Sequence, residues 1–229
     1  MKYLIFDAGP VISLATNNLL WLLKPLKDKY GGKFYITDKV KHELVDVPLE
    51  TKKFKFEALQ VQKLIDDKVI EILENEFIKN ETPRILRLAN EVFRAYGNYI
   101  RIVHFAEMSV LAACISTDAD AVVIDEKTTR FLVENPRMVV EILRKNLHTS
   151  VYINENNLKE LRNFVKKVKL IRSVELAVVA YELGLLKDYV VNVPQARRNL
   201  LEGILWGVKL NGCAVSTDEI QNILKAELS

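Results

Sequence analysis

The chain has 229 residues, which is enough for one large domain or for one domain with an appended lobe. Its hydrophobic content of 49% and charged content of 28% are typical of globular proteins and exclude a largely disordered chain. Lysine and arginine number 33 against 30 aspartate and glutamate, so the formal net charge of +3 excludes a strongly cationic, histone-like nucleic-acid binder.

Cysteine content and hydropathy predict the compartment. Cys114 and Cys213 are too few for a disulfide framework and lack zinc-site spacing, which favours a reducing cytoplasm. The first residues lead directly into a strand, and the apolar run 174–186 contains Glu175 and Glu182. We therefore expect a cytoplasmic protein with no signal peptide and no membrane span.

The first predicted element is a buried strand over residues 3–6 that ends at Asp7. Its continuous apolar sequence is typical of a parallel strand covered by helices on both faces. Gly9 permits a sharp turn and Pro10 suits the first turn of a helix, so Asp7 lies beside a helix N-terminus. Open α/β sheets bind ligands at this carboxyl edge, although Asp7 alone is equally compatible with a turn residue that binds backbone N–H groups.

The hydrophobic pattern then predicts further alternation of helices and strands. In chain order these are two helices or one kinked helix over 10–30, a short strand over 34–37, a helix from 38 to 48, a helix over 52–66, an edge strand over 69–73 and a helix over 80–98. Thr37 or Asp38 can cap the helix that starts at 38, and Glu43 lies beside the buried stripe of that helix.

Residues 103–115 are apolar on nearly every side of a predicted helix, which indicates a buried helix. Glu107 shares one face with Val103, Val110, Leu111 and Cys114. An ionised carboxylate is costly in such surroundings unless it is paired or coordinates a cation. The alternative is a frayed, solvated first turn.

A second buried strand, residues 121–124, ends at Asp125 and repeats the opening pattern. Asp125 can line a ligand-binding crevice at the carboxyl edge of the sheet, or it can simply cap the helix predicted over 128–133. The remaining pattern predicts helices over 138–145, 156–168, 173–183 and 196–205, a short apolar segment over 151–153, and a last helix with a capping box at Ser216 and Glu219. No repeat or linker divides the chain, so we predict one α/β domain spanning 1–229.

Four carboxylates are predicted to meet at one edge of the sheet. Asp7 and Asp125 each end a buried parallel strand, while Glu43 and Glu107 lie near the starts of helices that begin at the same edge. Four carboxylates in one crevice repel one another and raise their pKa values unless a cation neutralises them. Without cysteine or histidine ligands, the expected ion is Mg²⁺ or Mn²⁺, which suits phosphoryl transfer.

The sequence resembles the PIN-domain nucleases. Their four acidic motifs are similar to I-F-D-A-G-P around Asp7, V-K-H-E-L around Glu43, F-A-E-M-S around Glu107 and V-V-I-D-E around Asp125. The resemblance also covers the C-terminal V-E-L-A-V-V-A-Y-E-L-G segment and leaves residues 131–170 as a helical insertion. It implies a parallel central sheet flanked by helices on both faces, with extra C-terminal helices. The implied activity is Mg²⁺- or Mn²⁺-dependent cleavage of single-stranded RNA, with all four acids as metal-binding and catalytic residues, in a homodimer.

One departure from the family pattern concerns the residues after Asp7. Many members have serine or threonine there, whereas this chain has Ala8 and Gly9, so a supporting hydroxyl is missing from that position. Glu126 either adds a supporting carboxylate or only favours a helix dipole. The family includes toxins of toxin-antitoxin pairs and RNA-maturation enzymes, so an antitoxin protein is one expected partner.

Two other functions compete with the nuclease. A catalytically inactive PIN-fold RNA-binding or scaffold protein would be expected to lose some of the acids, whereas all four positions are acidic here. A phosphatase with Asp7 as nucleophile normally has a second aspartate where this chain has Gly9. Candidate phosphate-binding residues are Lys39, Lys127 and Arg130 near the crevice, and a basic stripe at Arg162, Lys166 and Lys169 is either a phosphate site or a solvated face.

Overall fold

The structure is a computed structural model that describes residues 2–228. Its centre is a five-stranded sheet in which every pairing is parallel. The strand order is β3 (Glu71–Leu73), β2 (Lys33–Thr37), β1 (Tyr3–Phe6), β6 (Ala121–Val123) and β8 (Leu170–Ile171). The opening strand is central, which explains why Ile5 and Phe6 are fully buried, and the polar alternation of β3 correctly predicts an edge strand.

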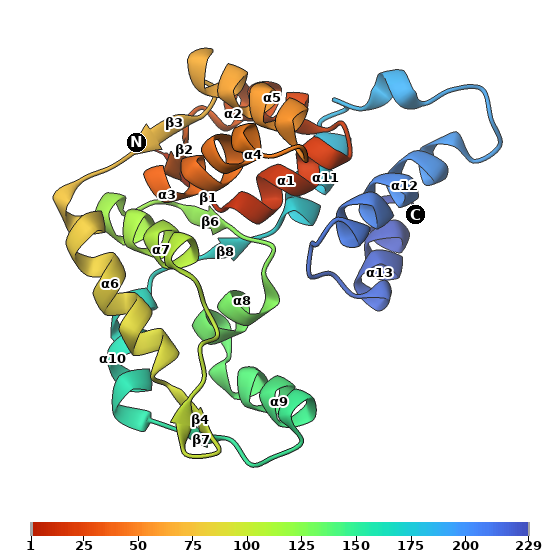
Figure 1. The fold of residues 1–229 in the computed structure, drawn as a ribbon. Helices are drawn as coiled ribbons and strands as arrows, with labels where there is room; N and C mark the ends of the chain where they lie inside the picture. The colour runs from red at the N-terminus through yellow and green to blue at the C-terminus, as the bar shows by residue number, and fades with distance from the viewer. Residues whose placement is uncertain (1, 229) are drawn as a thin grey trace.

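Helices cover both faces of this sheet, as predicted (Figure 1). Helix α7 packs on β1, β2 and β6 with α6 and α10 behind it, and α1, α5 and α11 lie on the opposite side. The α-helices are α1 (Ala8–Thr16), α2 (Leu23–Tyr30), α3 (Asp38–Lys41), α4 (Val47–Glu50), α5 (Lys55–Asp66), α6 (Glu76–Asn90), α7 (Phe105–Thr117), α8 (Lys127–Glu134), α9 (Pro136–Leu147), α10 (Glu155–Val165), α11 (Ser173–Glu182), α12 (Ala196–Leu210) and α13 (Thr217–Leu228). Shorter helices are η1 (Leu20–Leu22), the π-helix η2 (His42–Asp46) and η3 (Lys187–Tyr189).

The helix predicted over 80–98 is wrong beyond residue 90. Helix α6 ends at Asn90, and the chain forms a hairpin of β4 (Phe93–Ala95) and β5 (Asn98–Tyr99). The turn places Tyr96 at φ 51° and Gly97 at φ 79°, and this left-handed pair is the geometry that joins hairpin strands. Strand β4 also pairs with β7 (Tyr152–Ile153), so a small antiparallel sheet ties residues 93–99 to the segment 131–170.

The C-terminal helices form a second, smaller core. Val174 of α11 packs with Leu201, Leu205 and Val208 of α12 and with Ile220 of α13. Figure 1 shows α12 and α13 as a pair beside α1 and α11. The last helix begins with the predicted capping box, since Ser216 and Glu219 exchange hydrogen bonds. No helix within residues 2–228 combines the length and apolar content that a membrane crossing requires.

Candidate metal centre

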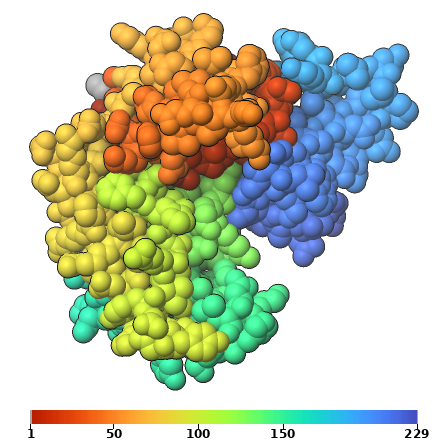
Figure 2. Space-filling model, viewed as in Figure 1, coloured from red at the N-terminus to blue at the C-terminus, as the bar shows by residue number. Residues whose placement is uncertain are grey.

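A cleft of about 310 Å³ lies at the carboxyl edge of the sheet and is lined by Asp7, Glu43, Glu107 and Asp125. The four predicted carboxylates therefore line one cleft, and Glu126, His104 and Asn211 add further polar side chains to its lining. Figure 2 shows the red N-terminal, green central and blue C-terminal segments meeting near the centre of one face. Whether these side chains bind metal and catalyse a reaction stays a prediction.

Strand register makes Asp7 and Asp125 neighbours. Phe6 of β1 lies opposite Val123 of β6, and the Asp7 N–H donates to the Val123 carbonyl at 2.9 Å. A Cβ atom added at Gly9 would lie 3.6 Å from Asp125 Cβ and 3.7 Å from Asp7 Oδ2. These are ordinary contact distances, so Gly9 lies between the two acids without excluding a side chain there.

Glu107 is held at the first turn of α7 by two hydrogen bonds. Its Oε2 accepts from the His104 N–H at 3.1 Å and from Thr129 Oγ1 at 2.8 Å. The first turn is therefore ordered and partly buried, so the alternative of a frayed turn is wrong. The Thr129 hydroxyl comes from α8, which explains why spacing within residues 103–115 did not predict it.

Glu43 lies at the exposed rim of the cleft, on the π-helix η2. The predicted helix stop at Pro48 is wrong, because the chain passes through this π-turn directly into α4. The π-helix satisfies backbone groups with wider hydrogen bonds, and such turns often occur at functional sites. Thr37 caps α3 as predicted, since its hydroxyl accepts from the Val40 N–H at 3.3 Å.

All four carboxyl groups have a raised pKa, first because the protein around them removes part of their hydration, even for Glu43 at the rim. Burial first, and the charges of Glu107 and Glu43 next, raise the pKa of Asp7 to about 7, although N–H groups of Ala8 and Gly9 oppose the shift. Burial also raises the pKa of Glu107, of Asp125 and of Glu43. The metal-free cleft therefore favours protons, and a cation that replaces them removes the repulsion.

Asp125 is fixed by a residue that the sequence pattern did not single out. The Ser173 N–H donates to Oδ1 at 2.8 Å, and the Ser173 hydroxyl donates to Oδ2 at 2.7 Å. Helix α8 is capped by Glu126, which accepts from the Thr129 N–H, so the alternative reading of Asp125 as that cap is wrong. Ser173 follows the two-residue strand β8, which is too short for its periodicity to be recognised.

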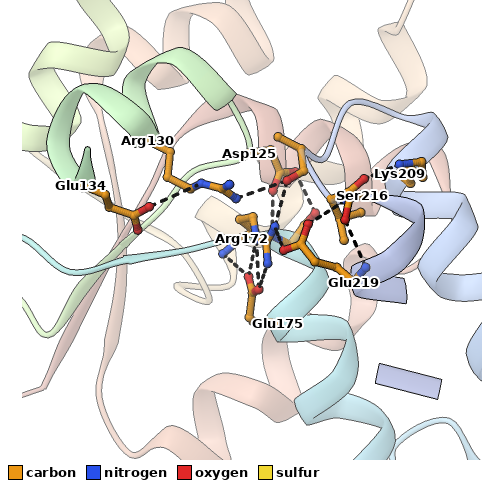
Figure 3. Close-up of polar contacts among 11 residues, drawn as sticks. Asp125, Arg130, Glu134, Arg172, Glu175, Lys209, Ser216 and Glu219 are labelled. Atoms are coloured by element: carbon orange, nitrogen blue, oxygen red, sulfur yellow. Dashed lines mark hydrogen bonds and ion pairs between the residues drawn. The ribbon is translucent and has the colours of Figure 1, made fainter. Parts of the chain in front are cut away.

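A network behind Asp125 ties the C-terminal helices to the cleft (Figure 3). The guanidinium of Arg172 donates to the Ala214 carbonyl at 2.8 Å and to Glu219 at 2.9 Å, and it is paired with Glu175. The Ala214 N–H donates to the Asp125 carbonyl at 3.2 Å. The loop between α12 and α13 is therefore joined directly to the backbone of the fourth carboxylate.

The predicted phosphate-binding residues differ in their availability. Arg130 donates to the Ala214 carbonyl at 3.2 Å and lies 3.6 Å from Glu134, so this guanidinium serves the network in Figure 3. Lys127 lies 5.6 Å from the centre of the Phe131 ring. Lys39 lies 6.0 Å from the centre of the Phe105 ring and 4.0 Å from Asp38.

The donor set suits a hard divalent cation. The acids that line the cleft offer oxygen atoms, burial disfavours their unneutralised charges, and Ser173 and Thr129 orient two of them. Within residues 2–228, no three His, Cys, Asp or Glu side chains are grouped closely enough to enclose an ion as they stand. The type of the ligand atoms and their burial suit a cation, whereas the positions of the side chains do not yet form a complete coordination shell.

Open α/β sheets bind ligands at the carboxyl edge, and here that edge gathers four acids whose oxygen atoms suit a divalent cation. A family model described as the PIN domain matches residues 3–141. Because the match covers more than half of the chain, the protein belongs to the PIN-domain family. PIN domains are generally nucleases that use divalent metals. Searches of curated proteins and of solved structures returned no match.

Proposed function

We propose that the protein is a cytoplasmic endoribonuclease that hydrolyses phosphodiester bonds of single-stranded RNA with Mg²⁺ or Mn²⁺. The observation that carries this proposal is the meeting of Asp7, Glu43, Glu107 and Asp125, from four separate segments, in one cleft. A bound cation would act there as a Lewis acid and neutralise charge on the scissile phosphate. The buried Asp7 and Asp125 and the partly buried Glu107 would hold the cation, with Glu43 at the exposed rim of the cleft.

The hydroxyl groups that support the acids do not come from the residues that follow Asp7. Ala8 and Gly9 follow Asp7, but Ser173 and Thr129 donate to Asp125 and Glu107. These donors restrict the carboxylate rotamers and favour their charged forms, which are the forms that bind cations. The departure from the family pattern is therefore compatible with an active site.

Cleavage of a labelled single-stranded RNA tests the proposal. We expect Asp7→Asn and Asp125→Asn to abolish cleavage because they remove cation ligands while keeping side-chain size, and EDTA to abolish it in the native protein. Asp28→Asn is the matched control, because Asp28 is exposed on α2 and does not line the cleft. If the native protein binds RNA but cleaves it with neither ion, or if Asp7→Asn cleaves equally well, the inactive scaffold function replaces the nuclease.

We also propose that the protein forms a homodimer. Helices α1, α4 and α5 pack together and expose Ile12, Leu49, Phe56 and Leu59, with Phe56 and Leu59 at 69% and 55% exposure. A second copy of the chain would bury these side chains, because an apolar surface of this kind is unfavourable in water. An antitoxin protein is the other partner that the family suggests for such a surface.

A further inference from the structure

A second groove adjoins the carboxylate cleft. Its volume is about 700 Å³, and it lies between α6 and the segment 98–105. This segment runs from the β4–β5 hairpin back beside α6 to the start of α7 (Figure 1). His104 lines both the groove and the carboxylate cleft, so the two are adjacent. None of the functional residues described above accounts for this groove.

Asn90 fixes the walls of the groove. Its side-chain oxygen accepts from the N–H groups of Ile102 and Val103 at 2.7 and 3.1 Å. Its amide nitrogen donates to the Val103 carbonyl at 3.1 Å. Three hydrogen bonds from one side chain therefore hold the segment against α6, which makes the groove a preformed surface and lowers the entropic cost of binding there.

The groove presents two arginines whose guanidinium groups have no partner among the described residues. Arg87 and Arg101 are exposed, and neither guanidinium makes a hydrogen bond or ion pair within residues 2–228. Arg84 lies one turn earlier in α6 but is held by Glu160 at 2.7 Å. The lining also contains one acid, Glu91, whose carboxylate accepts from Asn157 at 3.5 Å. Unpaired guanidinium groups are suited to bind phosphate oxygens.

Two exposed aromatic rings line the same groove. Tyr99 is 45% exposed and Phe105 is 38% exposed. The guanidinium of Arg94 lies 5.1 Å from the centre of the Tyr99 ring, which helps to hold that ring in place. Aromatic rings beside arginines are the chemistry with which proteins bind unpaired bases and their phosphates.

We propose that the groove binds single-stranded RNA and leads it past His104 into the carboxylate cleft. The inference rests on the proposed nuclease for the fate of the RNA, but binding in the groove does not require cleavage. Duplex RNA would not offer its bases to Tyr99 and Phe105, so unpaired strands are the expected ligand.

Binding is measured in the Asp7→Asn background with EDTA, using a labelled single-stranded RNA of about a dozen nucleotides, a length within known single-strand site sizes. We expect Arg87→Gln and Arg101→Gln each to reduce the slope of log affinity against log salt by about 0.7. We expect Tyr99→Leu to weaken binding at least about fivefold with the slope unchanged, because stacking is not ionic. Phe105→Leu serves as a second aromatic variant.

Arg84→Gln is the matched control, because it removes the same charge from the same helix but from a guanidinium already engaged by Glu160. In the native background, the groove variants should raise KM and leave kcat unchanged. If Arg87→Gln, Arg101→Gln and both aromatic variants bind RNA like Arg84→Gln, the groove proposal is wrong even when metal-dependent cleavage is observed. If cleavage is never observed but these variants weaken binding as expected, the groove proposal is supported and the nuclease proposal is wrong.

Discussion

Replacing Asp7 with asparagine is expected to stabilise the metal-free protein, and the size of the effect follows from the raised pKa. The pKa of Asp7 rises from 3.8 to about 7 in the folded state, because of burial and then the charges of Glu107 and Glu43. Between these two pH values the folded state binds one proton more than the unfolded state, so the free energy of unfolding falls as pH rises. At about 1.4 kcal/mol per pKa unit, the total loss at pH 8 is about 4 kcal/mol.

Asp7→Asn lacks this titration because its amide stays neutral. We expect the variant and the native protein to have similar stability near pH 4, and the variant to be more stable at pH 8 by up to about 4 kcal/mol. For a chain of this length that difference corresponds to roughly 10 °C in Tm. Acids with lowered pKa values, such as Asp46 and Asp120, add stability as pH rises, but they are common to both proteins and cancel in the difference.

Thermal melts of both proteins in EDTA, from pH 4 to 8, measure the difference directly. Asp28→Asn controls for loss of an exposed carboxylate. A difference in Tm that does not change with pH would refute the reasoning, because it would mean that Asp7 titrates at the same pH in the folded and unfolded states. A less stable variant at pH 8 would refute it as well.

Three further outcomes are expected. Mn²⁺ or Mg²⁺ should stabilise the native protein by about 2.7 kcal/mol at a hundredfold excess over Kd, and Asp7→Asn much less; an unchanged Tm in both would count against the site. In a metal titration, Ser173→Ala should lower the metal affinity about tenfold or more, because it releases Asp125. Ser109→Ala should leave the metal affinity unchanged, because it removes an equally buried hydroxyl that lies outside the cleft. Phe56→Glu should convert the expected dimer to a monomer in light scattering while Phe77→Glu, on α6, should not; a native monomer would refute the dimer.

The elements of the fold that depend only on their local sequence were predictable. Buried strands read as continuous apolar runs, and Asp7 and Asp125 both follow such runs, so a shared edge was a topological consequence. The turn at Tyr96 and Gly97 was missed because the preceding residues continue the helical pattern of α6, and the hairpin is stabilised by pairing with the distant strand β7. Local periodicity contains no information about such a partner.

The supporting residues of the site were not predictable for a related reason. Ser173 and Thr129 act on acids that lie 48 and 22 residues away in the chain, and nothing in their local sequence marks them. The position of Arg130 shortly after Asp125 suggested that it was available to bind phosphate, but its guanidinium donates a hydrogen bond to the Ala214 carbonyl. Long-range hydrogen bonds decide which polar groups are available, and they exist only once the chain has folded.

The attachment of Ala214 to Asp125 has a consequence for synthesis of the chain. The family match ends at residue 141, yet β8, Ser173 and Ala214, which pair with β6 or hold Asp125, come later. During translation the N-terminal half leaves the ribosome first, with β6 still lacking its outer neighbour and Asp125 lacking its donors. The cleft is completed only after nearly all of the chain has emerged.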